Sequence, residues 1–394
     1  MEPRPETRLR SLAGLRFGAA LALLFFHHAD AFTAWAPRWA EAIRSGGFVW
    51  VGLFYVLSGF VLARAHPEPL SPGERRAFWA ARIARLYPAY LLAFLLAAPF
   101  AIERWKEAAA PGATAKAATV ALASLLLVQA WFPPIARLWN APGWSTSVVL
   151  SFYVAFPFVV ARLSRLRRRG LWLALAGAWG LSLAAPLLWL ALRPDGAVAD
   201  LTWNEPRWLL ALKFHPLARA GEFLAGVALG RLHRRGPGPG RAAPLAGPVA
   251  LAAVVAALVW NGAPYPLLHN GLLVPLFAVL ILSVASERGP LARVLGCGPA
   301  QALGDAAFAI YVLQEPLYMW AHLAVGEQRS LSAAFLVAWP ACTVAVALMV
   351  ARLLERPARR ALRGLIAPPD PAPVPQGPPD AGPAPLPGAR SLPP

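Results

Sequence analysis

The first apolar stretch of the chain contains an arginine and a histidine, Arg16 and His27, eleven residues apart. At about 100° per residue of an α-helix, both side chains lie on one helix face, roughly 16 Å apart along the axis. Ionisable groups inside a membrane helix are unfavourable unless they face a protein interior or a water-filled cavity, so they mark functional sites. The alternative is that the two side chains reach opposite membrane surfaces as anchors.

The histidine of this pair is suited to proton transfer, because imidazole exchanges protons near neutral pH. Asp30 follows three residues later, close to the same face, and can fix the imidazole tautomer. His28 points about 100° away, which favours a packing or interfacial role. Arg16 can hold phosphate or carbonyl oxygens by charge-assisted hydrogen bonds. We therefore expect His27, Arg16 and Asp30 to form a catalytic group.

Further charged and polar residues recur in later apolar stretches. Arg82 and Arg85 are i,i+3 neighbours where such a stretch begins, and their guanidinium groups suit phosphates, although anchoring at a membrane surface explains them equally well. Glu222 follows Arg219 by three residues, so an intrahelical ion pair is its simplest interpretation. Ser58 and Gly59 indicate close helix packing rather than a serine nucleophile.

The composition identifies the class of protein. Of 394 residues, 58% are hydrophobic and only 14% are charged, and the mean hydropathy is +0.51. These values predict an all-α polytopic membrane protein. The net charge of +18 does not indicate nucleic acid, because the arginines cluster between apolar runs, where anchoring at the cytoplasmic surface accounts for them. Two cysteines are too few for a disulfide framework.

The sequence contains about eleven apolar runs long enough, or nearly so, to cross a bilayer. Basic clusters alternate with them, except that three runs lie between Arg85 and Arg162, and an odd number of crossings cannot return the chain to the same side. The run 118–133 ends in two prolines and several tryptophans, so we interpret it as a re-entrant segment. The prediction is about ten crossings in the cell membrane, with both termini cytoplasmic.

The domain organisation is simple. Residues 8–362 are expected to form one membrane domain, without a soluble catalytic domain or a cleavable signal peptide. From residue 368 the chain is rich in Pro, Ala and Gly, which predicts a disordered cytoplasmic tail over 368–394.

Six short motifs, in register along residues 8–355, resemble the membrane-bound acyltransferase family three. The first is the arginine, ten residues, histidine pattern from Arg16 to His27. The others are G-L-F-Y-V-L-S-G-F-V-L at Gly52–Leu62, R-I-A-R-L-Y-P-A-Y at Arg82–Tyr90, W-S-T-S-V-V-L-S-F-Y-V-A-F-P at Trp144–Pro157, G-E-F-L-A-G at Gly221–Gly226 and F-A-I-Y-V-L-Q-E-P at Phe308–Pro316.

The resemblance implies transfer of an acyl group, most simply acetyl, from acyl-CoA as co-substrate to a hydroxyl of a saccharide or glycosylated acceptor, without a metal. For such a reaction we expect His27 to exchange the proton, Arg82 and Arg85 to hold the phosphates of coenzyme A, and four residues to bind the acceptor. The acceptor residues are Trp144, Glu222, Gln314 and Glu315.

Two positions depart from the family pattern. Val149 stands where a glutamate is common, and Gln314 stands where a histidine is common. Neither side chain titrates, so Glu222 or Glu315 becomes the candidate for the missing carboxylate. Two alternatives remain open: a glycolipid or polysaccharide transporter or flippase, and a relative that binds its ligands without turnover. The lack of an internal repeat argues against the transporter.

Overall fold

The computed structural model describes residues 9–28, 37–107, 112–197, 206–236, 240, 243–260, 262–326 and 332–366, and these residues form helices and no strand. The N-terminal half contains α1 (Ser11–His28), α2 (Arg38–Ser45), η3 (Gly46–Val49), α3 (Trp50–Ala65), α4 (Pro72–Glu107), α5 (Ala113–Leu125), η4 (Gln129–Trp131), η5 (Pro133–Ile135), α6 (Gly143–Ser164) and α7 (Arg168–Leu192). The C-terminal half contains α8 (Arg207–Phe214), α9 (Pro216–Arg235), α10 (Ala243–Trp260), α11 (Tyr265–His269), α12 (Val274–Ala285), α13 (Gly289–Leu295), α14 (Gly298–Asp305), α15 (Ala307–Val325), α17 (Ala333–Val350), η6 (Ala351–Glu355) and α18 (Arg356–Ile366).

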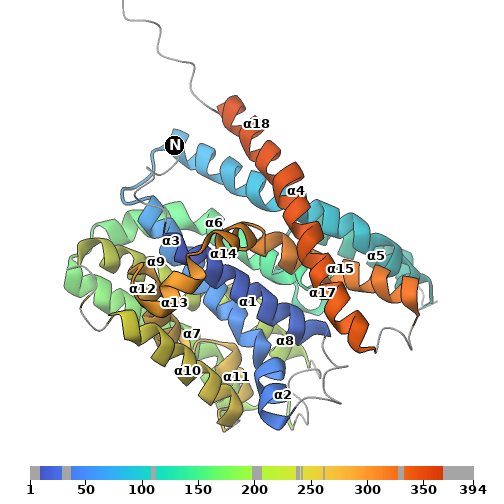
Figure 1. Cartoon of the computed structure of the whole chain (residues 1–394), viewed down its shortest axis with the longest axis horizontal. Helices are drawn as coiled ribbons and strands as arrows, with labels where there is room; N and C mark the ends of the chain where they lie inside the picture. Colours follow the sequence, from blue (N-terminus) through green and yellow to red (C-terminus); the bar gives the residue numbers. More distant parts are fainter. Residues whose placement is uncertain are drawn as a thin grey trace, which may run out of the picture.

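The helices form a bundle around α1, α3 and α9. Figure 1 shows α1 and α3 in the middle, with α7 and α10 on one side and α4, α17 and α18 on the other. In the described part of the chain, eight helical stretches are long and apolar enough to cross a membrane. Two more long helices, α9 and α15, have 20 and 19 residues and carry charged side chains. The sequence predicts about ten crossings, a number that is reached when α9 and α15 are counted with the eight stretches. The all-α polytopic fold is confirmed.

Glycines let α9 approach two neighbours at backbone distance. A Cβ on Gly226 would overlap the carbonyl oxygen of Val56, and a Cβ on Gly59 would overlap that of Phe223, so α3 and α9 touch through both glycines. Gly221 packs in the same way against Ala178 of α7. In a membrane, lipid provides no hydrophobic driving force between helices, and close contacts through small residues hold the helices together instead. The close packing predicted for Gly59 is confirmed, whereas its neighbour Ser58 faces a cavity.

Arginines at the end of α9 tie several helix ends together. Arg234 donates to the carbonyl oxygen of Arg64 at 2.9 Å, and Arg235 donates to that of Ser164 at 2.8 Å. These carbonyls belong to the C-terminal turns of α3 and α6, which have no partner within their own helices. Arg75, at the start of α4, lies over the ring of Phe158 in α6 at 5.4 Å. We call this the basic end of the bundle.

The segment after α4 packs against α4 and then turns. α5 has only 13 residues, about 20 Å of helix. It ends beside the middle of α4, where Tyr90 and Tyr87 donate hydrogen bonds to the carbonyl oxygens of Ser124 and Leu125 at 2.7 and 3.0 Å. Leu127 then adopts a left-handed conformation, with φ 56°. The chain therefore turns at Leu127, before the Pro133–Pro134 pair that the sequence suggests, because the tyrosines satisfy the carbonyls at this helix end.

Two predicted features lie outside the described residues. They are the C-terminal tail over 368–394 and the segment that holds Asp30.

Candidate active site

A first cavity lies toward the basic end, between α1, α3, α4, α6 and α15. Its polar lining consists of three arginines and several hydroxyl groups, and its walls are aliphatic and aromatic. The arginines are Arg16, Arg82 and Arg85, and the hydroxyl groups belong to Tyr55, Ser58, Ser145, Thr146, Tyr153 and Tyr311.

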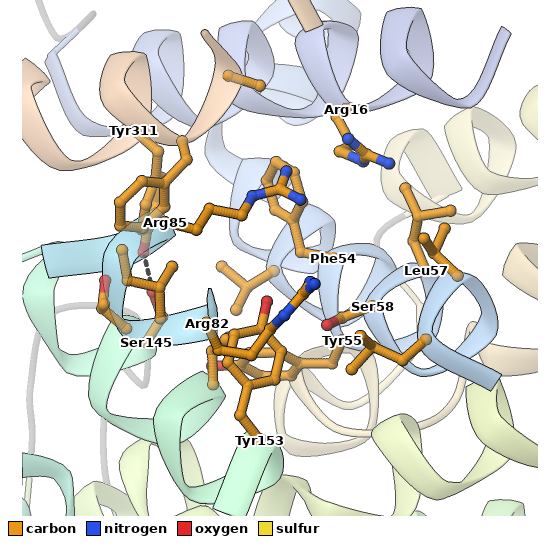
Figure 2. A pocket seen from close by; sticks show the side chains of 18 of the residues that line it. Arg16, Phe54, Tyr55, Leu57, Ser58, Arg82, Arg85, Ser145, Tyr153 and Tyr311 are labelled. Carbon is orange, nitrogen blue, oxygen red and sulfur yellow. Dashed lines mark hydrogen bonds between the residues drawn. The ribbon is translucent and has the colours of Figure 1, made fainter. Parts of the chain in front are cut away.

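The three arginines come from separate places in the sequence and meet in this cavity. Figure 2 shows their guanidinium groups directed toward the same space beside Phe54 and Ser58. Arg82 lies over the rings of Phe78 and Tyr153 at 5.3 and 5.9 Å, so its planar group is held by aromatic faces. The three arginines predicted to contact donor phosphates thus line one cavity.

The outer side of Arg85 borders a mixed charge cluster. Glu355, in the π-helical turn η6, lies near Arg85 and pairs with Arg359 at 2.9 Å. Asp305 pairs with Arg356 at 3.6 Å in the same region. The start of α18 therefore surrounds this side of Arg85 with both signs of charge.

A second cavity lies on the other side of Tyr311, away from the basic end. His27 lines it together with Trp144, and so do two cations, Arg137 and Lys213. Lys213 lies 5.5 Å from the ring centroids of both Phe214 and Tyr265. The cavity thus combines one imidazole with aromatic faces and two positive charges. The predicted base His27 and the predicted acceptor residue Trp144 share this space.

The two cavities share part of their walls. Among the described lining residues, Val51 and Tyr311 belong to both. The face shared by Arg16 and His27 on α1 therefore passes both spaces, Arg16 in the first and His27 in the second. The sequence predicts that Arg16 and His27 line one wall. In the tertiary structure they line two different cavities, both of which Tyr311 borders.

Glu222 lies outside the lining of both cavities. It pairs with Arg219 at 2.9 Å and accepts a hydrogen bond from the backbone amide of Gly271 at 3.3 Å. Arg219 also donates to Asn270 at 2.9 Å and lies over the ring of Tyr55 at 5.3 Å. Both members of the pair are buried. The simpler of the two sequence interpretations, an intrahelical ion pair, describes this arrangement, and the pair joins α9 to the loop before α12.

The other two predicted acceptor residues are also absent from the cavity linings. Gln314 is buried beside His27, and its side-chain amide donates to the carbonyl oxygen of Tyr311 at 3.0 Å. Glu315 lies 3.3 Å from His28, which stacks on Tyr318 with ring centroids 4.3 Å apart. His28 is thus held by aromatic packing and a polar contact, in line with the packing role that the sequence suggests.

The position of Val149 shows what its departure from the family pattern changes. Val149 lines the first cavity, close to the arginines. A glutamate there would face three positive charges, and here the described lining has no acidic side chain. No group of three or more His, Cys, Asp or Glu side chains that could hold a metal is found within the described ranges.

Sequence reasoning missed several lining residues. Tyr55 and Tyr311 lie inside motifs that the sequence displays, but neither motif indicates which side chain faces a cavity. Arg137 and Lys213 are isolated cations beside apolar stretches, and that isolation is the signal that could have found them. His269 reaches the second cavity from α11 through a contact that no local pattern predicts.

Comparison with known proteins covers nearly the whole chain. The family model described as an acyltransferase domain matches residues 9–351. The chain is 29% identical to the acyltransferase MdmB of Streptomyces mycarofaciens, over 94% of this chain and 97% of the relative. It is 38% identical to protein 2 in the picA locus of Rhizobium radiobacter, over 26% of this chain and 50% of that protein. No solved structure matches the chain.

Proposed function

Because the chain belongs to the acyltransferase family, we propose that it moves an acyl group, acetyl by preference, from acyl-CoA to a hydroxyl of a saccharide or glycosylated acceptor. That it is a transferase of acyl groups follows from the family. The proposal concerns the identity of the donor, of the acyl group and of the acceptor. It rests on the chemistry of the two cavities.

The first cavity suits the donor. Acyl-CoA carries phosphates at one end and a thioester at the other, so its site needs cations at the entrance and an apolar channel behind them. Arg16, Arg82 and Arg85 supply guanidinium groups that bind phosphate oxygens in pairs. Val149 and Phe54 continue the lining with apolar surface.

The second cavity suits a sugar hydroxyl. His27 can accept the hydroxyl proton when the acceptor oxygen attacks the thioester carbon. Trp144 and Phe214, whose ring centroids lie 4.8 Å apart, offer aromatic faces against which a sugar ring can pack. Arg137 and Lys213 supply hydrogen-bond donors to sugar oxygens.

The observation that carries the proposal is that an arginine-lined cavity and a histidine-lined cavity share Val51 and Tyr311. A donor in the first cavity and an acceptor in the second would both border these two residues. Direct transfer needs this arrangement, because both reactants must be held together at the reacting atoms.

Purified protein tests the proposal. With acetyl-CoA and a set of alkyl glycosides, the release of free coenzyme A thiol should depend on the glycoside, and the product should carry one acetyl ester. A transporter would release no thiol. A relative that binds without turnover, the alternative suggested by Val149 and Gln314, would bind acetyl-CoA but release none.

We also propose that the basic end faces the cytoplasm of a cell membrane, which places both described ends of the chain on that side. Arginine-rich loops are retained there during insertion. Single cysteines at Arg75 and Arg167, in a background without Cys297 and Cys342, should be protected from an impermeant reagent in intact cells. A cysteine at Trp208, which is 57% exposed beyond the opposite end of α7, should react. Opposite labelling of the first two positions would contradict the re-entrant α5.

A further inference from the structure

Tyr311 occupies the boundary between the two cavities. Of the two residues that line both, Val51 presents only methyl groups, so the Tyr311 hydroxyl is the one polar side-chain group common to the described linings. The residue is buried in α15, and its ring lies 6.3 Å from that of Phe54. Its position in the bundle is therefore fixed by packing on a rigid helix.

A hydrogen bond orients the hydroxyl group. Ser145 of α6 lies 2.9 Å from the Tyr311 oxygen, as the dashed line in Figure 2 shows. Each hydroxyl group has a single proton and can accept as well as donate. The serine oxygen also lies 3.1 Å from the carbonyl oxygen of Pro142, which can only accept. When Ser145 gives its proton to that carbonyl, Tyr311 donates to the serine oxygen, and the phenol proton can turn from the serine to a substrate oxygen that becomes negative.

Tyr311 is also linked to the proposed base through its own helix. Gln314, one turn later, donates to the Tyr311 carbonyl oxygen and lies beside His27. His27 and Tyr311 both line the second cavity, so the proton acceptor and the phenol border the same space. A thioester bound in the arginine-lined cavity would border Tyr311, and the His27 imidazole would lie in the neighbouring cavity.

We propose that Tyr311 is a catalytic residue that donates a hydrogen bond to the thioester carbonyl oxygen as that oxygen becomes negative. The inference rests on the proposed function. A donor fixed in an apolar, water-poor junction is worth far more than one in water, because it is already oriented when the charge develops. Val51 and Phe54 supply the apolar part of the surroundings.

The step balances as follows. The acceptor oxygen forms a bond to the thioester carbon while its proton passes to the His27 imidazole, and the carbonyl π electrons move to the oxygen beside Tyr311. When the carbonyl re-forms, the carbon–sulfur bond breaks and the thiolate takes the proton back from the imidazolium. The products are an ester and coenzyme A thiol, and Tyr311 keeps its proton throughout.

The variant Tyr311→Phe keeps the ring and removes only the donor. We expect kcat with acetyl-CoA and a glycoside acceptor to fall by about 10²–10³-fold, the usual loss for one oxyanion donor, with the KM for acetyl-CoA changed less than twofold. Ser145→Ala should lower kcat less. The double variant should be no slower than Tyr311→Phe alone, because both changes act on one hydroxyl.

The matched control is Tyr318→Phe, two turns along the same helix, which lines neither cavity and should leave kcat unchanged. Melting temperatures in detergent show whether each variant is folded. An active wild type with Tyr311→Phe within threefold of its kcat overturns this inference alone. A wild type that consumes no acetyl-CoA with any acceptor overturns the proposed function and this inference together.

Discussion

The two cavities are built from different chemistry although they meet at one tyrosine. The first is lined by three arginines and aliphatic walls, and the second by a histidine, aromatic rings and two further cations. A phosphate-bearing donor matches the first, and a hydroxyl-bearing ring matches the second. α1 contributes to both cavities, because Arg16 lines the first and His27, eleven residues later, lines the second.

A third group of buried charges lies outside both cavities and has a structural role. Arg219 and Glu222 lie in neither cavity and hold each other at 2.9 Å, with Asn270 and Gly271 as further partners. A buried ion pair of this kind joins helices. The arginines of the first cavity instead border a space that a ligand can enter.

Loss of the base should have the largest effect. His27→Ala should lower kcat by about 10²–10⁴-fold, the range for a general base, while acetyl-CoA binding, measured by calorimetry, stays near wild type. His28→Ala is the matched control and should be much milder, because His28 faces Glu315 and Tyr318. Activity of His27→Ala within threefold of wild type would remove His27 from the second cavity's chemistry.

Breaking the buried ion pair should come next, as a loss of stability. Glu222→Gln leaves the Arg219 charge buried without its counter-ion, which destabilises by about 3–5 kcal/mol. The melting temperature in detergent should fall by several degrees. Glu103→Gln is the control, because Glu103 and Lys106 form an exposed i,i+3 pair. Equal melting temperatures for both variants would show that the pair does not hold α9 in place.

The donor cavity should respond to loss of one arginine by a smaller amount. Arg85→Gln should raise the KM for acetyl-CoA at least tenfold, because a charge-assisted contact is worth about 1.5–3 kcal/mol. The acceptor KM should stay nearly constant, and Arg82→Gln should behave similarly. Arg76→Gln removes an exposed charge from the same helix and should change neither constant. If Arg85→Gln and Arg82→Gln misinsert with donor kinetics unaltered, the two arginines are only anchors.

The smallest effect is expected for the aromatic wall of the acceptor cavity. Trp144→Leu should raise the acceptor KM about threefold to tenfold, since one aromatic contact contributes about 0.5–1.5 kcal/mol. The donor KM should not move. Trp172→Leu, at a 52% exposed position of α7, controls for the loss of a tryptophan. A rise in the donor KM instead would place the donor in the second cavity.

Much of the fold was predictable because membrane crossing imposes a length and a composition. Apolar runs and arginine clusters predict ten crossings and a re-entrant α5, and the structure has eight qualifying stretches together with α9 and α15. The end of α5 was misplaced by several residues, since Tyr87 and Tyr90 lie in another helix and cap its carbonyls. A pattern within one segment contains no information about such partners.

The candidate site, like the fold, was predictable from the sequence only in part. The sequence by itself determined that Arg16 and His27 share a helix face and that Arg82 and Arg85 lie one turn apart, because helical geometry relates residues close in sequence. Only the tertiary structure decided that Arg16 joins Arg82 and Arg85, that His27 lies with Trp144, Arg137 and Lys213, and that Glu222 lies in neither cavity. Those relations depend on which helices pack together, and glycine contacts such as Gly226 on Val56 set that packing across long separations in the chain.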